Sequence, residues 1–222
     1  ITDATSGYNP ADPYKNRDPR LLQTVLTNGT NFTVNDKTAV LETFNGGVDG
    51  PTAYQNASQT GYYLQKFLVP AAVWDNRSVN ISRTWVLIRF AELYLNYAEA
   101  TNEAYGPNAE VYAALKALRT RAGFTVKDIQ AGLTKDQMRK VIQNERRIEL
   151  AFEEHRNFDA RRWRTAAKDF SGNMWGFRVL YDDATKKYSF PRYAFQVRKY
   201  LPHWDLYPIP QAEIDKSKGK LV

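Results

Sequence analysis

The middle of the chain, residues 82–167, carries apolar side chains at the spacing of α-helices. Its clearest pattern runs from Ser82 to Tyr105, which we predict to be one helix. One apolar face of this helix holds Leu87, Ala91, Tyr94, Leu95 and Ala98, and a second holds Val86, Phe90, Leu93 and Tyr97. A helix that is apolar on two faces is expected to be buried over most of its circumference.

Two further helices are predicted after a break at residues 105–108, which contain glycine and proline. The first runs from Ala109 to Ala122 and stops at Gly123, so it should form an antiparallel hairpin with the preceding helix. The second begins at the capping-box pair Thr134 and Gln137. It leads into residues 144–163, is expected to bend near residues 155–157, and continues as another helix to Ala167.

Residues 144–163, with the sequence NERRIELAFEEHRNFDARRW, are densely charged but keep the apolar spacing of a helix. Glu145 and Glu149 fall on the same face as the apolar side chains. Burying an unpaired carboxylate is costly, so this face predicts basic partners from elsewhere in the chain. The candidates are Arg89, Arg119, Arg121, Arg146, Arg161 and Arg162.

The two ends of the chain are different in character. Residues 1–80 are rich in turn-forming Asn, Gly and Pro, and we expect them to be loop-rich and draped over the helices. Within them, residues 21–26 predict either a short strand or a helical turn. Residues 171–222 predict a β-hairpin, formed by residues 177–181 and 187–190, followed by an extended, proline-containing tail with a helical turn at residues 211–214.

Composition narrows the possible classes of protein. The 222 residues are 43% hydrophobic, contain no cysteine, and have no run long enough for a membrane span. The formal net charge of +7 makes a nucleic-acid partner conceivable, but the basic residues are interleaved with acids, which favours intramolecular pairing and no nucleic-acid partner. Because the chain starts at Ile1 without a signal peptide, we expect a mature or cleaved piece.

Signals for catalysis are absent from the sequence. His155 and His203 are the only histidines, and without cysteine they predict no metal site and no cofactor. Glu153 and Glu154 are conceivable glycosidase carboxylates, but acids among arginines more often form structural ion pairs. We therefore expect no catalytic residues and no enzyme.

Aromatic residues in predicted loops are the best candidates for ligand contacts. Trp74 stands beside Asn76 and Arg77, whose side chains can bond sugar hydroxyls while the indole covers a sugar face. Tyr54 and Trp175 are two further aromatics in predicted loops. Packing of each ring into the core is the competing interpretation. The predicted ligand-binding set is Trp74, Tyr54, Trp175, Asn76 and Arg77.

Several segments, in one order along the chain, resemble a known family. They are NPADPYKNRDPRLLQTVLTNG, GYYLQKFLVP, RTWVLIRFAELYLNYAEATNEA, LKALRTRAGF, NERRIELAFEEHRNFDARRW and LYPIPQAEID. Together they resemble the SusD/RagB family of outer-membrane nutrient-binding lipoproteins of Bacteroidetes. The resemblance implies a mainly α, SusD-like fold with tetratricopeptide-type helical hairpins, long loops and a small β-hairpin.

The resemblance covers the C-terminal half of the family. It implies that one domain spans residues 1–222, with the loop-rich, helical and hairpin-and-tail parts at 1–80, 82–167 and 171–222. The N-terminal half, with its lipidated cysteine, would be absent, and the hairpin of residues 83–105 and 109–122 would dock onto it. Residues that match the family's structural signature, and so are expected to serve folding, are Glu145, Arg146, Glu149, Asp159, Arg161 and Trp163.

The function implied by the resemblance is non-catalytic capture of an oligosaccharide at the surface of the outer membrane. The partner would be a SusC-like TonB-dependent transporter, and contact with the membrane would be only through the lipid anchor of the missing part. Two alternatives stay open: a protein-interaction scaffold for the transporter that binds no sugar, and binding of a non-sugar nutrient such as a peptide.

Overall fold

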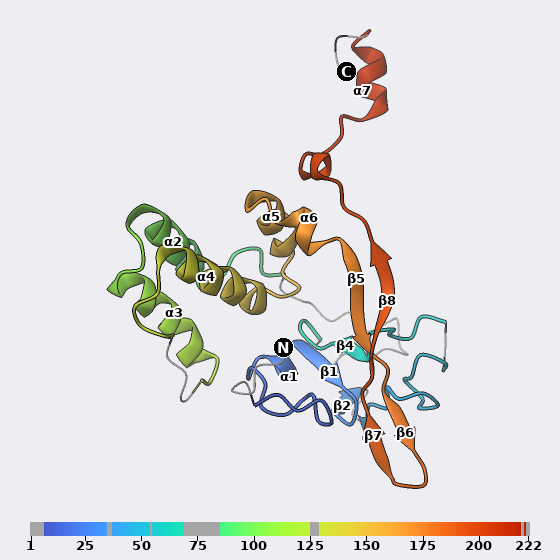
Figure 1. Ribbon diagram of the computed structural model, residues 1–222. Coiled ribbons are helices and arrows are strands. Elements are labelled where there is room, and N and C mark those ends of the chain that lie inside the picture. The colour runs from blue at the N-terminus through green and yellow to red at the C-terminus, as the bar shows by residue number, and fades with distance from the viewer. Residues whose placement is uncertain are drawn as a thin grey trace.

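Helices α2 to α6 gather on one side of the molecule and most strands on the other, while α1 lies beside β1 and α7 lies at the end of the tail (Figure 1). The computed structural model describes residues 7–34, 37–53, 55–68, 85–124, 129–218 and 220. The helical side consists of α2 (Phe90–Tyr105), α3 (Ala109–Arg121), α4 (Lys135–Glu149), α5 (His155–Arg162) and α6 (Ala166–Asp169) (Figure 1). This arrangement confirms the prediction of a mainly α fold with helical hairpins and small β elements.

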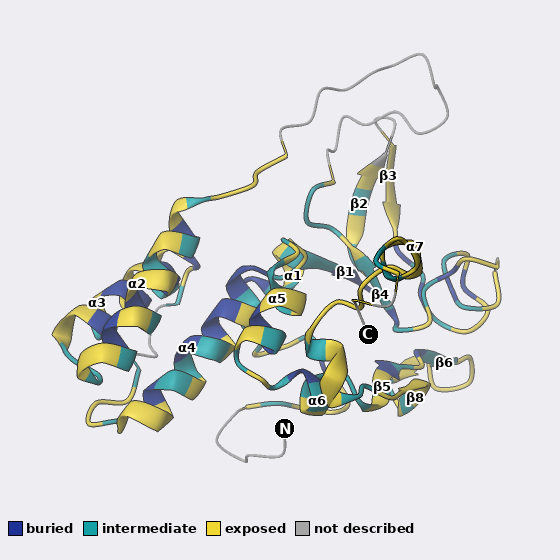
Figure 2. Cartoon of the chain, turned by 90° about the horizontal axis from the view of Figure 1, so that it is seen from above, coloured by how far each residue is buried: buried dark blue, intermediate teal, exposed yellow. Residues whose placement is uncertain are grey.

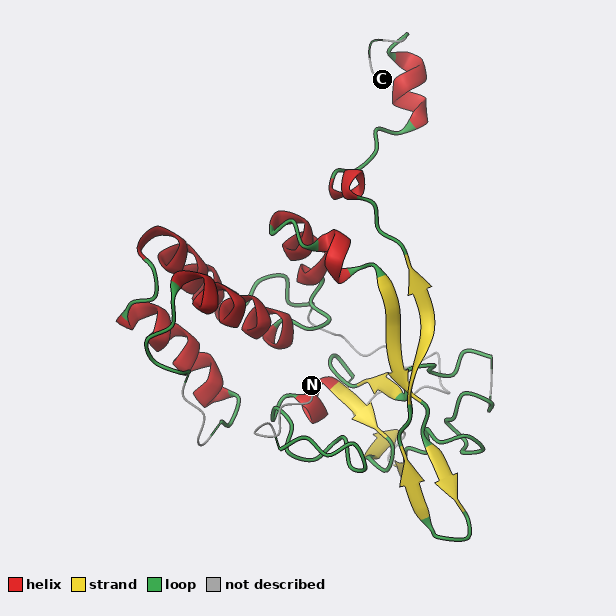
Figure 3. Ribbon diagram, viewed as in Figure 1, coloured by secondary structure: helices red, strands yellow, loops and turns green. Residues whose placement is uncertain are grey.

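The strands form four two-stranded antiparallel sheets in the described part of the chain (Figure 3). After α1 (Leu21–Thr24), β1 (Val25–Thr27) pairs with β4 (Tyr62–Leu64), and β2 (Asn31–Val34) pairs with β3 (Lys37–Val40). The apolar run at residues 21–26 is therefore a helical turn followed by a strand. In the C-terminal part, β5 (Gly172–Phe177) pairs with β8 (Arg192–Arg198), and β6 (Leu180–Asp182) pairs with β7 (Lys187–Ser189).

The hydrophobic core lies where α2, α3 and α4 meet (Figure 2). Each helix contributes fully buried aliphatic side chains to it, among them Leu95, Leu115 and Ile142. The starts of two helices are fixed by side chains that accept hydrogen bonds from free backbone N–H groups. Asn108 caps α3, and Thr134 with Gln137 forms the predicted capping box of α4.

The helix α2 is shorter than the sequence predicts. It begins at Phe90 rather than Ser82, and residues 85–89 precede it in non-helical conformation. Arg89 is extended, because its guanidinium reaches Glu149 and Glu153. The predicted burial is also wrong for one face, since Phe90, Leu93 and Tyr97 are exposed in this chain.

The end of α4 likewise differs from the prediction. The helix stops at Glu149, before the predicted bend at residues 155–157, and a turn over residues 150–154 leads into α5. In this turn Phe152 and Glu154 have positive φ angles of 63° and 66°. Lys66 donates to the carbonyl oxygens of Glu149 and Ala151, so side chains satisfy groups that a longer helix would have bonded.

The loop-rich N-terminal part is joined to the C-terminal strands by close backbone contact. The N–H of Phe177 donates to the carbonyl of Thr60 at 3.1 Å, and the Tyr193 hydroxyl donates to the carbonyl of Gln59. Gly176 permits this approach, because a Cβ atom there would lie 2.8 Å from the Cα of Thr60. The segment at residues 59–61 thus holds β5 in place.

The chain after β8 runs away from the body of the molecule (Figure 1). It passes through the 3₁₀ turn η2 (Pro202–Asp205) and ends in α7 (Gln211–Lys216), and neither element has a buried residue. The predicted hairpin is confirmed as β6 and β7, although Phe177 belongs to β5. The predicted extended tail and terminal helical turn are also confirmed.

Candidate functional site

A buried ion-pair cluster connects the N-terminal segment to the end of α4. Arg20, which is 6% exposed, donates through Nη1 to Glu145 at 2.7 Å and to Glu149 at 2.8 Å. Its other guanidinium nitrogens bond both oxygens of Asp18 at 2.7 and 2.9 Å. The remaining members of this ion-pair cluster are Lys66, Arg89, Arg119, Arg121 and Glu153.

Glu149 is the centre of this cluster. Its carboxylate accepts from Arg20, from Arg89 at 2.6 Å and from Arg121 at 2.5 Å, and the residue is only 3% exposed. Burial alone would raise the pKa of Glu149, but hydrogen bonds from Arg20 and Arg89 outweigh it and hold the pKa below its ordinary value. The pKa of Glu153 is lowered in the same way, against burial, by Arg89 and Lys66.

The geometry assigns the acids of α4 to structure. Of the predicted partners, Arg89, Arg119 and Arg121 do contact Glu145 or Glu149. The prediction is wrong for the three others. Arg146 donates to Asp159 and Asn96, and Arg162 forms a bidentate pair with Glu99. Arg161 donates to the carbonyl of Trp204. Arg20 was not predicted, because it lies 125 residues from Glu145 along the chain.

Acid should weaken this cluster. Some carboxyl groups have a lower pKa in the folded chain than in the unfolded chain. Such a group stabilises the fold fully at a pH above its unfolded pKa, and this stabilisation is lost as the pH falls toward its folded pKa. For Glu149 and Glu153 the ordinary value is 4.5. We therefore expect urea midpoints to be level above that pH and to fall steadily below it. In the variant Glu149→Gln the urea midpoint should fall less steeply with decreasing pH. Equal pH dependence in the variant and the parent chain would contradict a stabilising role for the Glu149 carboxylate.

The structure places only one of the five predicted ligand-binding residues. Trp74, Asn76, Arg77 and Tyr54 lie outside the described residues. Trp175 lies on β5 rather than in the predicted loop, because residues 173–176 pair with β8. The residue is 47% exposed, and the guanidinium carbon of Arg192 lies over its ring, 4.2 Å from the ring centre.

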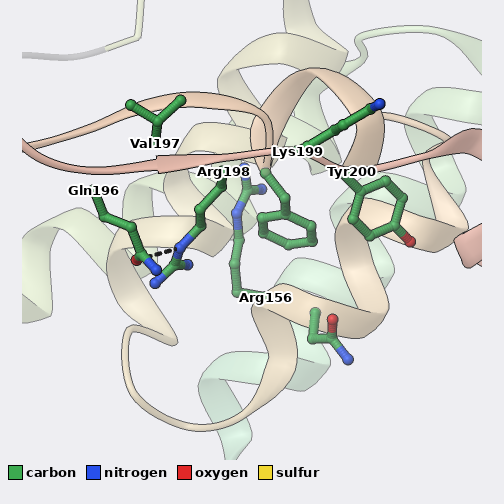
Figure 4. Close-up of a pocket in the computed structure, with 8 residues that line it drawn as sticks. Arg156, Gln196, Val197, Arg198, Lys199 and Tyr200 are labelled. Carbon is green, nitrogen blue, oxygen red and sulfur yellow. Dashed lines mark hydrogen bonds between the residues drawn. The ribbon is translucent and has the colours of Figure 1, made fainter.

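A second candidate surface is an open pocket of about 700 Å³ between α5, the end of α6 and the end of β8 (Figure 4). Arg156 rises from α5, and Gln196, Arg198 and Tyr200 lie on the side of the β8 chain that faces it. Val197 and Lys199 lie on the opposite side, as strand alternation requires. We did not predict this pocket, although the alternation of polar residues 196, 198 and 200 is a signal for it.

Two aromatic rings, those of Phe170 and Tyr200, also line the pocket. The Phe170 and Tyr200 rings lie 5.8 Å apart at an angle of 57°, and Arg156 stands 5.9 Å from the Phe170 ring centre. The Tyr200 hydroxyl donates to Asp205 at 3.1 Å, which fixes the orientation of the Tyr200 ring.

In the described ranges, no three His, Cys, Asp or Glu side chains are grouped as metal ligands, and no helix is long and apolar enough to cross a membrane.

The helical hairpins and the two exposed surfaces around Trp175 and Arg198 describe the architecture of the chain. Comparison with known proteins identifies the family to which the chain belongs. The chain belongs to the SusD family, whose model matches residues 1–222. The resemblance in the sequence motifs is thereby confirmed.

Individual relatives agree with the family assignment. Over 125 residues the chain is 30% identical to SusD-like protein P2 of Formosa agariphila, covering 54% of this chain and 25% of that protein. A SusD-like protein from Bacteroides fragilis superposes with a TM-score of 0.78 at 26% identity, covering 93% of this chain and 38% of the other. A SusD-like carbohydrate binding protein from the same species gives 0.70 at 26% identity, covering 94% and 42%. The chain thus spans a quarter to about two fifths of these relatives.

Proposed function

We propose that this chain captures an oligosaccharide without cleaving it. The observation that carries the proposal is the exposed Trp175 side chain, held on a strand with the Arg192 guanidinium over one face of its ring. The opposite face of the indole can cover the apolar face of a sugar ring, and the Arg192 N–H groups can donate to hydroxyls. Membership of the SusD family supports this ligand class, and one of its relatives is itself a carbohydrate binding protein. The ion-paired carboxylates of α4 have no part in the binding.

Replacing Trp175 with alanine should weaken sugar binding about tenfold, which corresponds to about 1.4 kcal/mol of lost stacking. Isothermal titration calorimetry with the best oligosaccharide from a glycan array would measure it. The matched control is Tyr105→Ala, which removes an 84% exposed ring at the far end of α2. Trp74→Ala tests the companion prediction in the segment outside the described residues. Unchanged affinity in both tryptophan variants would contradict the site assignment.

The place of action we propose is the outer surface of the outer membrane, beside a SusC-like TonB-dependent transporter that imports the captured ligand. The SusD-family match supports this location and this partner. The exposed face of α2, with Phe90, Leu93 and Tyr97, supports a docking role. We propose that this face packs against the N-terminal half that longer relatives carry.

A second candidate function is a protein-interaction scaffold that binds no sugar. It is favoured by the exposed apolar side chains of the tail, Trp204, Leu206, Tyr207 and Ile209, together with the α2 face. Co-purification with a transporter alongside a blank glycan array would support the scaffold and exclude capture. A positive array in which the Trp175 variant loses signal would support capture. Release of shorter sugars from any polysaccharide would contradict both.

A further inference from the structure

The pocket between α5 and β8 has an excess of positive charge. Arg156 pairs through Nη2 with Asp169 at 2.7 Å, so its positive charge is balanced by that carboxylate. Arg198 has no carboxylate partner within the described ranges, and its one side-chain hydrogen bond goes to the neutral amide of Gln196 at 2.7 Å. Two acids contact residues that line the pocket: Asp169 pairs with Arg156, and Asp205 accepts from the Tyr200 hydroxyl. Arg198 is therefore the guanidinium that is free to take an anion.

Two neighbouring cations strengthen the local field. Lys199 follows Arg198 on the other side of the chain and adds a second positive charge to the pocket lining. Arg161 stands 5.9 Å from the Tyr200 ring centre, and its Nη1 atom is buried with no hydrogen-bond partner in the described structure. A guanidinium group bonds an anion more strongly than it bonds a neutral sugar hydroxyl.

The other groups in the pocket suit a sugar rather than a free ion. The Phe170 and Tyr200 rings give apolar area, and the amides of Asn157 and Gln196 can donate to and accept from hydroxyls. A guanidinium presents two parallel N–H donors, which match the two oxygens of a carboxylate or sulfate. We propose that this pocket binds an acidic saccharide, with its carboxylate or sulfate on Arg198 and its ring against Phe170 and Tyr200.

This inference rests on the proposed capture of oligosaccharides and deepens it to a ligand class. Its test is affinity gel electrophoresis of the 222-residue chain in matched pairs of polysaccharides. Polygalacturonate is compared with its methyl-esterified form, and dextran sulfate with dextran. We expect an acidic member to retard the chain more than its neutral partner, and added salt to reduce the retardation. Arg198→Gln should raise the dissociation constant about tenfold, the loss of one bidentate charged contact.

The control is Lys187→Gln, which removes one positive charge from an exposed position on β7, outside the pocket. It should change affinity less than twofold, and both variants should keep the parent's melting temperature. Equal losses of affinity in the two variants would show general charge attraction and overturn the pocket as the binding site. Full competition by inorganic sulfate at matched concentration would show that the pocket binds the anion alone and overturn a saccharide as its ligand. Retardation by neutral polysaccharides alone would overturn the acidic ligand and leave capture intact. Retardation by none would contradict capture as well.

Discussion

Replacing Glu149 with alanine is expected to lower the free energy of unfolding by about 3–5 kcal/mol, the usual cost of breaking a buried ion pair from one side. Three guanidinium groups, from Arg20, Arg89 and Arg121, would lose a shared carboxylate. Arg20 is buried and cannot regain water without moving the segment that carries it. For a chain of this size the melting temperature should fall by about 10 °C. Urea denaturation followed by circular dichroism measures both quantities.

The matched control for this variant is Glu213→Ala. Glu213 pairs with Lys216 at 2.7 Å on the exposed face of α7, and such surface pairs contribute about 0–1 kcal/mol. Sugar affinity should be unchanged in Glu149→Ala below its melting transition, since Glu149 lies in neither ligand surface. A loss of stability no larger than that of the control, or a loss of affinity before a loss of stability, would show that the cluster is not structural.

Replacing Arg20 with alanine should have an effect of similar size, about 3–5 kcal/mol, because Glu145 and Glu149 are 1% and 3% exposed and both lose a donor. Arg20 also ties the start of the loop-rich segment to α4. We therefore expect trypsin to cut the N-terminal segment sooner in this variant than in the parent chain. Arg20→Lys should recover only part of the stability, since an ammonium cannot reproduce the guanidinium fork between Asp18 and the two glutamates.

Arg17→Ala is the control for Arg20, three residues away on the same segment. Arg17 donates to the carbonyl of Pro13 and lies over the Tyr8 ring, without a carboxylate partner in the part described. Its removal should cost less than about 1 kcal/mol. In a double-mutant cycle, Arg20→Ala and Glu149→Ala should be strongly non-additive. Additive losses would mean that the two residues act independently.

Local signals along the chain predicted the local structure. The turn at residues 105–108, the stop at Gly123 and the capping box at Thr134 are patterns of neighbouring residues, and each is present in the structure. The two wrong helix ends have non-local causes. Arg89 is extended because it reaches Glu149 and Glu153, and α4 ends early where Lys66 takes its carbonyl oxygens. Neither contact has a signature near the helix end it alters.

The same distinction applies to the sites. The sequence predicted that Glu145 and Glu149 need basic partners, since apolar spacing shows which face they occupy. It could not select Arg20 over the other arginines, because the pairing depends on how two distant segments meet. Trp175 was predicted to lie in a loop, but it lies on β5, whose partner strand β8 begins at Arg192. The predictions for Trp74, Asn76, Arg77 and Tyr54 remain predictions.

The length of chain between Arg20 and Glu149, 129 residues, has a consequence for the order of folding. Closing so large a loop is entropically slow, whereas α3 and α4 can meet early because they are close in sequence. Arg119 and Arg121 lie only 26 and 28 residues from the glutamates they contact, so they can neutralise α4 first. Arg20 would then join last, and the N-terminal segment would fold onto a helical nucleus whose acids already have partners.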